Sequence, residues 1–452
     1  MHDSIVLIGA GSAQFTRGLV AALIRQNQPI DLALVDVDAR ALRVAESLTR
    51  KMVAAGGAPI TVRATTDRRQ ALPGATAVIC TIGVGGRRAW EQDVFIPRRH
   101  GLYAPVGDTV GPGGSSRALR MIPAMVAIAH DVLDLAPTAV FINYSNPMTA
   151  ICRAVNKATG AGVVGLCHGV DSMTDYLAEA LQESRADLTC TAIGVNHLTW
   201  FVDVRVRGQD AGPRVRALAE AKLAAGIDSQ AVMPDYPFAG MDWPHHRLFS
   251  WELVRRFGAI AAAGDRHTSE FFPQFFRHGQ YFGQTLGIDA FSFETTIAEG
   301  DAVFAEMQRL ALDPSPLPAE VLAPDDPEPE RAIAFLRALR EGGDLTVSAN
   351  LPNTGQVPNL PRDAVLESPA RVALGQLQAL PMPPLPAGIV GTLATRLAWV
   401  ETIVEAALEG SREKFIQALV LDGYVESFDA AAQLADELLA AQAAHLPQFA
   451  SP

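Results

Sequence analysis

The glycine-rich turn near the start of the chain places the strongest constraint on its fold. Residues 4–8 form a short apolar run, and Gly9-Ala10-Gly11-Ser12 follows it directly. Residues 15–25 then show the spacing of a helix. A strand, a tight glycine turn and a helix in this order open a parallel α/β sheet, and the N–H groups at the helix start can bind a pyrophosphate. The turn therefore predicts a Rossmann-like domain that binds a nucleotide.

The first half of the chain continues this alternation of strand and helix patterns, which is typical of a parallel sheet with crossover helices. A chain of 452 residues is also too long for one ordinary core. We therefore expect an α/β protein with a Rossmann-like domain over residues 1–195 and a mixed α/β domain over residues 196–452. Further strands are expected at residues 32–35, 60–64, 77–82, 139–143 and 163–167, helices at 39–54 and 117–135, and a hairpin or two separate strands at 188–195 and 199–206.

The second half is more irregular. Residues 312–330 are acidic and rich in proline, and residues 351–361 are similar, so both stretches predict loops. Residues 364–372 resume an ordered pattern. Residues 393–408 and 430–444 are rich in Ala and Leu and predict helices that pack the second domain.

Composition excludes several classes of protein. The net charge of −12, without a basic stripe, argues against a nucleic-acid-binding surface. Residues 1–13 do not resemble a signal peptide, and we expect no apolar run near the roughly 20 residues that span a bilayer. The four cysteines (Cys80, Cys152, Cys167 and Cys190) are too few and too scattered to cross-link the chain. We expect a cytoplasmic, reduced protein without nucleic-acid or membrane partners.

The nucleotide turn departs from the usual fingerprint at one position. Gly9 and Gly11 fit its first two glycines, and Ser12 follows them, but Gln14 stands where a third glycine is usual. Asp36, after the second expected strand, can accept hydrogen bonds from ribose hydroxyls and would repel a 2′-phosphate, which favours NAD over NADP. The alternative is a tight turn without a ligand, with Asp36 as a helix N-cap.

Cys167 and His197 form a candidate metal pair. Cys167 ends an expected strand and therefore lies at the sheet edge where open α/β folds bind ligands. A thiolate and a neutral imidazole suit a borderline divalent metal, and two protein ligands leave positions open for substrate and water. Taken alone, each residue has another interpretation: a lone Cys is usually a small buried apolar side chain, and a lone His is usually a satisfied core or surface residue.

Three further residues are candidates for the same site. His168 follows Cys167, and because adjacent side chains on a strand point to opposite faces, it joins the site only if the chain turns at Gly169. Asn146 can bind sugar hydroxyls or the cofactor, or it can be a turn residue before a proline. Asp108 lies in a second glycine-rich loop, residues 107–114, which either holds substrate or is a flexible connection.

These motifs occur in a characteristic order. The chain resembles glycoside hydrolase family 4, the NAD- and divalent-metal-dependent glycosidases. The resemblance spans most of the chain and is weaker in the second half. It rests on Gly9–Ser12, Val84-Gly85-Gly86, Asp108–Gly114 with Arg117–Arg120, Asn143–Met148, Gly165–Gly169, Gly194–His197, Gly264–His267, Glu270-Phe271 and Asn359-Leu360-Pro361.

The resemblance implies a fold and a reaction. The fold is a Rossmann-like sheet followed by a domain of the lactate/malate dehydrogenase C-terminal type. The reaction is an elimination in which NAD+ takes hydride from C3 of the sugar and a base removes the C2 proton. A metal held by Cys167 and His197 stabilises the enolate, the glycosidic bond breaks, water adds, and the hydride returns. The expected metal is Mn, with Co, Ni or Fe as alternatives, and the expected assembly is a homodimer or homotetramer.

The resemblance also implies roles for single residues. Asp265 stands where some α-glycosidases of the family have the base, although it can equally cap a helix. His168 after the metal-binding Cys resembles the subgroup that acts on unphosphorylated α-glycosides, such as α-galactosides, α-glucosides or α-uronides, where it would contact a hydroxyl or assist the leaving group. Arg266 is a candidate for a uronate carboxylate, whereas Arg87 and Arg88 are better explained as solvated surface residues.

Two other functions remain as alternatives at this point. A 2-hydroxy acid dehydrogenase of the lactate/malate type would share the two-domain architecture and would need no metal, so chelator sensitivity separates it from the hydrolase. A nucleotide sensor without catalysis would turn over no glycoside, and Asp265 would then be dispensable.

Overall fold

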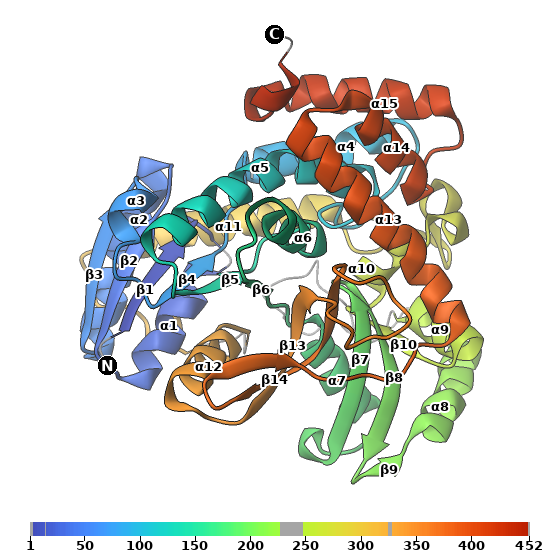
Figure 1. Cartoon of the computed structure of the whole chain (residues 1–452), viewed down its shortest axis with the longest axis horizontal. Coiled ribbons are helices and arrows are strands. Elements are labelled where there is room, and N and C mark those ends of the chain that lie inside the picture. Colours follow the sequence, from blue (N-terminus) through green and yellow to red (C-terminus); the bar gives the residue numbers. More distant parts are fainter. Residues whose placement is uncertain (1–2, 14, 227–246, 324–327, 451–452) are drawn as a thin grey trace.

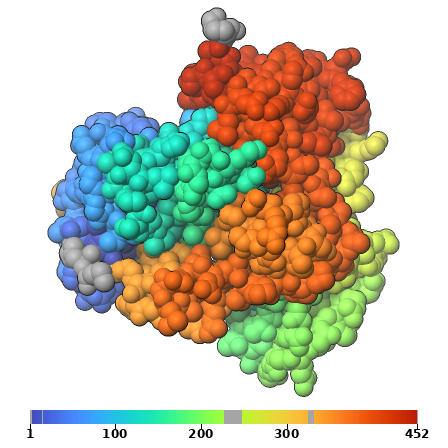
Figure 2. All heavy atoms as spheres, viewed as in Figure 1, coloured from blue at the N-terminus to red at the C-terminus, as the bar shows by residue number. Residues whose placement is uncertain are grey.

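In the computed structural model the chain folds around one large sheet (Figure 1). The structure describes residues 3–13, 15–226, 247–323 and 328–450. Within them, the sheet has 13 strands in the order β10-β8-β7-β14-β13-β6-β5-β4-β1-β2-β3, with β9 beside β8 and β15 beside β14. Figure 2 shows the N-terminal half, in blue and teal, beside the C-terminal helices in red and the orange segment of β13 and β14.

The parallel half of the sheet confirms the predicted Rossmann-like architecture. Its strand order, β3-β2-β1-β4-β5-β6, is that of a dinucleotide-binding sheet. Alternate side chains of β1 enter opposite cores: Val6 and Ile8 pack on the side of α5 and α6, and Ile5 and Leu7 on the side of α1 and α2. The strands are β1 (Asp3–Ile8), β2 (Ile30–Val35), β3 (Ile60–Thr65), β4 (Ala77–Cys80), β5 (Val140–Asn143) and β6 (Val163–Gly165). The helices are α1 (Thr16–Gln26), α2 (Ala39–Gly56), α3 (Arg68–Ala71), α4 (Gly86–Arg99), α5 (Gly111–Leu135), α6 (Met148–Thr159) and α7 (Gly169–Ala180).

Antiparallel strands extend the sheet beyond β6. β13 (Leu345–Pro352) pairs with β6 and with β14 (Val365–Ala373), and β14 pairs with β7 (Leu188–Val195). β7 and β8 (Leu198–Val206) form the predicted hairpin. The boundary expected after residue 195 falls in the turn of this hairpin, so the sheet continues across it, and the division into domains stays a prediction. The remaining strands are β9 (Gln209–Asp210), β10 (Ile260–Ala262), β15 (Gln376–Ala379) and a separate pair, β11 (Gln280–Tyr281) and β12 (Gln284–Thr285).

The loop expected over residues 312–330 is only partly correct. A long helix ends at Leu312, a short 3-10 turn covers Ala319–Val321, another helix begins at Glu328, and residues 324–327 lie outside the described part. Residues 351–361 begin with the end of β13 and continue as a loop. The helices of this half are α8 (Gly212–Ala225), α9 (Leu248–Phe257), α10 (Asp265–Thr268), α11 (Phe293–Leu312), α12 (Glu328–Glu341), α13 (Ala387–Glu409), α14 (Arg412–Asp422) and α15 (Phe428–Ala441).

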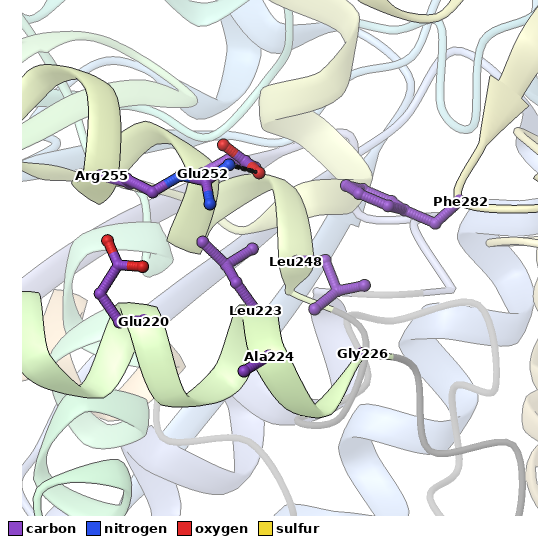
Figure 3. Close-up of a pocket in the computed structure, with 8 residues that line it drawn as sticks. All are labelled: Glu220, Leu223, Ala224, Gly226, Leu248, Glu252, Arg255 and Phe282. Atoms are coloured by element: carbon purple, nitrogen blue, oxygen red, sulfur yellow. Dashed lines mark hydrogen bonds and ion pairs between the residues drawn. The ribbon is translucent and has the colours of Figure 1, made fainter.

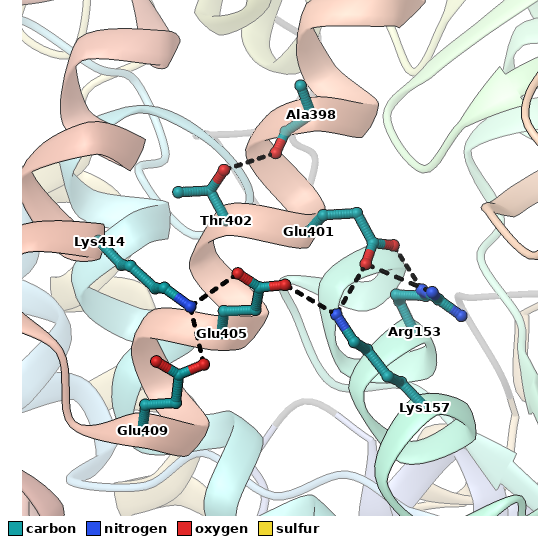
Figure 4. Close-up of polar contacts among 8 residues, drawn as sticks. All are labelled: Arg153, Lys157, Ala398, Glu401, Thr402, Glu405, Glu409 and Lys414. Carbon is teal, nitrogen blue, oxygen red and sulfur yellow. Dashed lines mark hydrogen bonds and ion pairs between the residues drawn. The ribbon is translucent and has the colours of Figure 1, made fainter.

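Among the described residues, helix α13 is the one helix that is long and apolar enough to cross a membrane by length and composition. An 18-residue stretch of this helix has a mean hydropathy of 1.3, enough for a span by composition alone. However, its buried face packs against α5, α6 and α14 (Figure 1), as in the core helix of a globular protein. Glu401 and Glu405 on α13 form ion pairs with Arg153 and Lys157 of α6, and Lys414 of α14 joins Glu405 (Figure 4). These contacts join the C-terminal helices to the Rossmann-like half.

Candidate active site

Three segments bring a carboxylate and two imidazoles together. Asp108 lies in the loop before α5, His197 in the turn between β7 and β8, and His267 in α10. One possible ligand atom of each, an oxygen of Asp108 and a ring nitrogen of each histidine, lies within 4.8 Å of the other two. The rings of His197 and His267 are 4.0 Å apart between centroids. Carboxylate oxygen and imidazole nitrogen are ligands for divalent metals, so these residues form a possible metal site.

The backbone holds His197 in an unusual conformation. Its φ is 66°, a left-handed value that residues other than glycine rarely adopt and that is often found at functional sites. The hydroxyl of Thr109 lies 3.1 Å from Nδ1 of His197, which orients the ring. The preceding residue, Asn196, is held by two hydrogen bonds. Its backbone N–H donates to Thr149 Oγ1 over 3.0 Å, and its Nδ2 donates to Glu367 Oε2 over 3.2 Å.

Asp108 is prepared to carry a negative charge. Its carboxylate accepts hydrogen bonds from Thr109 Oγ1 at 2.7 Å and from Asn146 Nδ2 at 2.9 Å. Burial alone would raise the pKa of Asp108, but the charges of His197 and Arg117, together with these hydrogen bonds, lower it below the usual value. The predicted site residue Asn146 therefore contacts another predicted site residue, Asp108.

His267 is kept neutral by its surroundings. Burial lowers the pKa of His267 well below its usual value, and the charges of His197, Arg266 and His168 lower it further. A neutral imidazole retains a lone pair and can bind a metal at neutral pH. In the sequence, His267 stands out only as part of the segment Gly264–His267, because a single histidine in a short helix has no distinguishing pattern.

Glu270 is a second residue without an assigned role in the sequence analysis. Its side chain is only 1% exposed, and Oε1 accepts the N–H groups of Val106 and Gly107 over 2.7 and 2.8 Å. Burial raises the pKa of Glu270 to about 8. Glu270 therefore fastens the loop that carries Asp108 to the segment that carries His267.

Asp265, the predicted base, has surroundings that also fit the alternative of a helix cap. Asp265 is fully buried and accepts four hydrogen bonds, from Phe249 N, Ser250 N, Ser250 Oγ and Tyr281 Oη, at 2.5–2.8 Å. These donors match the acceptor capacity of a carboxylate, so taking a substrate proton would break bonds inside the protein. The carboxylate satisfies two N–H groups at the start of α9, as a helix cap does, and the role of Asp265 as the base stays a prediction.

Cys167 and His168 lie directly after β6, at the carboxyl end of the parallel strands. Cys167 is half-buried, and the N–H of Gly169 lies 3.4 Å from its Sγ. Cys167 is not one of the three residues whose ligand atoms lie within 4.8 Å of one another in the described part. His168 precedes α7, and its charge contributes to the lowered pKa of His267. The pairing of Cys167 with His197 on one metal stays a prediction.

The glycine-rich turn has the close approaches that a nucleotide site requires. Gly9 has a φ of 91°, and a Cβ there would lie 2.8 Å from backbone atoms of Thr81 and Ile82. A Cβ on Gly11 would lie 2.6 Å from Ala41 Cβ and 2.8 Å from Asp36 Oδ2. The carboxylate of Asp36 accepts the N–H of Gly11 at 2.8 Å, so it faces the turn.

Other contacts of this turn show which residue caps the next helix. Ser12 Oγ accepts the N–H of Phe15 at 3.3 Å, just before α1. Asp38, and not Asp36, is the N-cap of α2, because its side chain accepts the N–H groups of Arg40 and Ala41. The alternative of Asp36 as a helix cap is therefore wrong.

The second glycine-rich loop does not offer its helix start to an anion. The first turn of α5 is already occupied by Asp422, which accepts the Ser115 hydroxyl over 2.8 Å and the backbone N–H of Gly111. Arg396 lies 3.1 Å from the same carboxylate and balances its charge. Burial nevertheless raises the pKa of Asp422 to about 6. This loop presents Asp108 and is tied to the C-terminal helices.

The three arginines considered for a substrate carboxylate differ in their surroundings. Arg87 and Arg88 both form ion pairs with Asp301, each at 2.6 Å, in agreement with the surface interpretation. Arg266 is buried beside His267, and its Nη2 donates to Thr296 Oγ1 over 3.0 Å. Its role toward a substrate stays a prediction.

Comparisons with known proteins agree with the motif order. The profile of the Family 4 glycosyl hydrolases matches residues 4–183, and the profile of the Family 4 glycosyl hydrolase C-terminal domain matches residues 192–425. The chain belongs to glycosyl hydrolase family 4.

Curated relatives of this family 4 hydrolase include three kinds of α-glycosidase. It is 30% identical to an α-glucosidase of Erwinia rhapontici, with 98% of both chains covered. It is also 30% identical to an α-galactosidase of Rhizobium meliloti, covering 99% of this chain and 89% of the relative, and to an α-galacturonidase of Bacillus subtilis, covering 93% of both. These comparisons favour the glycosidase over the dehydrogenase alternative.

Solved structures confirm the predicted fold class of the family 4 hydrolase. The Bacillus subtilis protein lplD, named a glucosidase, superimposes with a TM-score of 0.85 at 29% identity, covering 97% of this chain and all of the other. A 6-phospho-α-glucosidase from gut microorganisms, solved with NAD and Mn2+, gives 0.83 at 19% identity, with 99% of both chains covered. A malate dehydrogenase of Cryptosporidium parvum gives 0.51 at 13% identity, covering 90% of this chain and 99% of the other.

A separate cavity of the family 4 hydrolase lies away from these residues. Its volume is about 500 Å³, and it is an open hollow lined by α8, α9 and the turn at Phe282 (Figure 3). Asp108, His197 and His267 do not line it. Its walls consist of Glu220, Leu223, Ala224, Gly226, Leu248, Glu252, Arg255 and Phe282.

Proposed function

We propose that this family 4 hydrolase cleaves unphosphorylated α-glycosides with the help of NAD and a divalent metal. The observation that supports it most strongly is the meeting of Asp108, His197 and His267 in a chain that also has the nucleotide turn of its family. Its curated relatives at 30% identity act, by name, on α-glucosides, α-galactosides and α-galacturonides. The equal identities favour none of these three sugars.

The residues of the glycine turn fit NAD. Gly9 and Gly11 let the turn pack directly against Thr81, Ile82, Ala41 and Asp36, the tight backbone path that a dinucleotide turn needs. The N–H groups around Ser12 and the start of α1 would bind the phosphates, and Asp36 would accept the ribose hydroxyls in place of the N–H of Gly11.

The residues near Asp108 fit a divalent metal such as Mn, with Co, Ni or Fe as alternatives. His197 would offer the ring nitrogen that does not face Thr109, and Asp108 would offer a charged oxygen. Cys167 would add its thiolate, as the family resemblance implies. Bound NAD+ supplies a hydride acceptor, and the metal supplies a Lewis acid. Asn146 and His168 would orient the sugar hydroxyls beside these groups.

The test is release of p-nitrophenol from the α-galactoside, α-glucoside and α-galacturonide, with and without NAD+, Mn2+ and a thiol reductant. We expect hydrolysis of at least one substrate only when all three additions are present. Formation of NADH from a 2-hydroxy acid, without hydrolysis of any glycoside, would contradict the proposal and identify a dehydrogenase.

The assembly and location of the enzyme are part of this proposal. By family resemblance we expect a cytoplasmic homodimer or homotetramer whose substrate is a small α-glycoside, with no nucleic-acid or membrane partner. Light scattering of the purified protein gives the mass in solution, and a monomeric mass at micromolar concentration would contradict the assembly.

A further inference from the structure

Four consecutive side chains in the segment of α10 each contain a buried polar atom without a protein partner. These atoms are His267 Nδ1, Thr268 Oγ1, Ser269 Oγ and Glu270 Oε2, and none has a hydrogen bond within the described residues. In folded proteins roughly 90% or more of buried polar groups are satisfied. Because four such buried atoms follow one another in the chain, we expect a ligand, an ion or water to supply their missing hydrogen-bond partners.

His267 is the member of this group that faces other metal-binding side chains. Its ligand atom lies within 4.8 Å of those of Asp108 and His197. Two ligands on opposite sides of one ion, each about 2.0–2.2 Å from it, are at most about 4.4 Å apart. The distances between the ligand atoms of the three side chains are therefore close to those found around one bound ion.

We propose that His267 is a direct ligand of the divalent metal, sharing the ion with His197 and Asp108. The Cys167–His197 pair that the sequence suggested contains one imidazole, whereas this site contains two. The inference rests on the proposed function only in that a metal is bound. It is specific to the residues that this chain brings together.

Two surrounding features support His267 as a ligand. Its Nδ1 is buried without a hydrogen-bond partner among the described residues, and its ring lies 4.0 Å from that of His197 between centroids. Glu270, three residues later, holds the loop of Asp108 through the N–H groups of Val106 and Gly107. The segment of residues 267–270 therefore carries His267 and also holds the loop that carries the Asp108 carboxylate.

The experiment counts the imidazoles bound to Mn2+. The full-length protein is stripped of metal, loaded with Mn2+ in the presence of a reductant, and studied by electron spin echo envelope modulation, which detects coordinated imidazole nitrogen. The variants are His267→Ala, His197→Ala and, as a matched control, His130→Ala on the exposed side of α5. Calorimetry on the same samples gives the Mn2+ dissociation constant.

We expect two coordinated imidazoles in the wild type and in His130→Ala, and one in His267→Ala. The dissociation constant should rise by about 10–100-fold or more in His267→Ala, since even outer residues of metal sites contribute that much. A single imidazole in the wild type, lost in His197→Ala and retained in His267→Ala, would overturn the proposal. If His267→Ala does not fold, the count in the wild type decides alone.

The outcome is independent of the test of function. Two imidazoles on Mn2+ in a protein that hydrolyses no α-glycoside would keep His267 as a ligand and refute the glycosidase. Mn2+-dependent hydrolysis with one coordinated imidazole would keep the glycosidase and refute the ligand.

Discussion

At the scale of single residues, the site depends on acids and imidazoles whose charge is set by burial. Asp108 is held ionised by neighbouring positive charge, whereas Glu270, with two N–H donors on one oxygen, is held protonated near neutral pH. His267 is held neutral. Three titratable groups of one site thus have different protonation states, which is typical of catalytic centres.

Glu270 should make the stability of the enzyme depend on pH. Its pKa is raised from 4.5 to about 8, so between these values the unfolded chain releases a proton that the folded protein retains. Stability therefore falls as pH rises through this range. In Glu270→Gln this loss disappears, and the melting temperature of the variant relative to wild type should increase from pH 5 to pH 9. A difference that stays constant with pH would contradict the buried, protonated state.

Asp265 gives a second test at this scale. Asp265→Asn replaces one acceptor oxygen by an NH2 group, so one N–H donor of α9 loses its acceptor, at about 1–3 kcal/mol for an unsatisfied buried group. Tyr281→Phe removes one hydrogen bond to the same carboxylate, a loss of about 1.5–3 kcal/mol. We expect both variants to lower the free energy of unfolding in urea. Asp265→Asn with wild-type stability but at least a thousandfold lower kcat, beside a fully active Tyr281→Phe, would instead support the role of Asp265 as the base.

At the scale of elements, the functional residues lie where strands end and helices begin. The turn from β1 to α1 carries Gly9 and Gly11, the start of α5 follows Asp108, and the turn from β7 to β8 carries His197. The first turn lies at the carboxyl end of a parallel strand, where such sheets bind ligands. The loop before α5 and the turn of the antiparallel β7–β8 hairpin meet through Thr109 and His197, although they lie far apart in the chain.

The first of these turns should tolerate no side chain at its second glycine. Gly11→Ala places a Cβ against Ala41 Cβ and Asp36 Oδ2, so the turn or α2 must shift. We expect loss of NAD+ affinity by calorimetry of at least tenfold, with a modest decrease in melting temperature.

The matched control is Gly391→Ala in α13, where an added Cβ meets nothing within 4 Å. Alanine in an exposed helix is favoured over glycine by about 1 kcal/mol, so this variant should be slightly stabilised and bind NAD+ normally. Unchanged NAD+ affinity in Gly11→Ala would show that the cofactor does not approach this turn.

At the scale of the whole molecule, the C-terminal helices hold the Rossmann-like half in place through two kinds of charged contact. Arg396 and Asp422 form a buried pair that ends on Ser115 of α5. The pairs between α6, α13 and α14 are more exposed (Figure 4). Breaking a buried pair leaves an uncompensated charge, whereas exposed pairs contribute little.

The two kinds of contact should respond differently to mutation. Arg396→Met leaves Asp422 buried without its cation and should reduce the free energy of unfolding by about 3–5 kcal/mol. Lys414→Met, in the exposed network, should change it by about 1 kcal/mol or less. Urea denaturation of both variants measures the difference. Equal effects would mean that the buried pair contributes no more than a surface one.

The sequence by itself determined the parallel half of the sheet and the family. The apolar residues of its strands and helices recur with a clear period, and the turn at Gly9–Ser12 can adopt few conformations. The local sequence is therefore sufficient to predict these elements. Cys167, His197 and Asp108 were predicted as site residues because each occupies a recognisable motif.

Only the tertiary structure decided which residues meet. The insertion of β13 and β14 between β6 and β7 has no local signal, because pairing between distant strands depends on the whole fold. The roles of Asp265, His267 and Glu270 could not be assigned for the same reason: a carboxylate becomes an anchor or a buried acid through the donors and the degree of burial around it. Those surroundings come from α9, from the loop before α5 and from the β7–β8 turn, which only folding brings together.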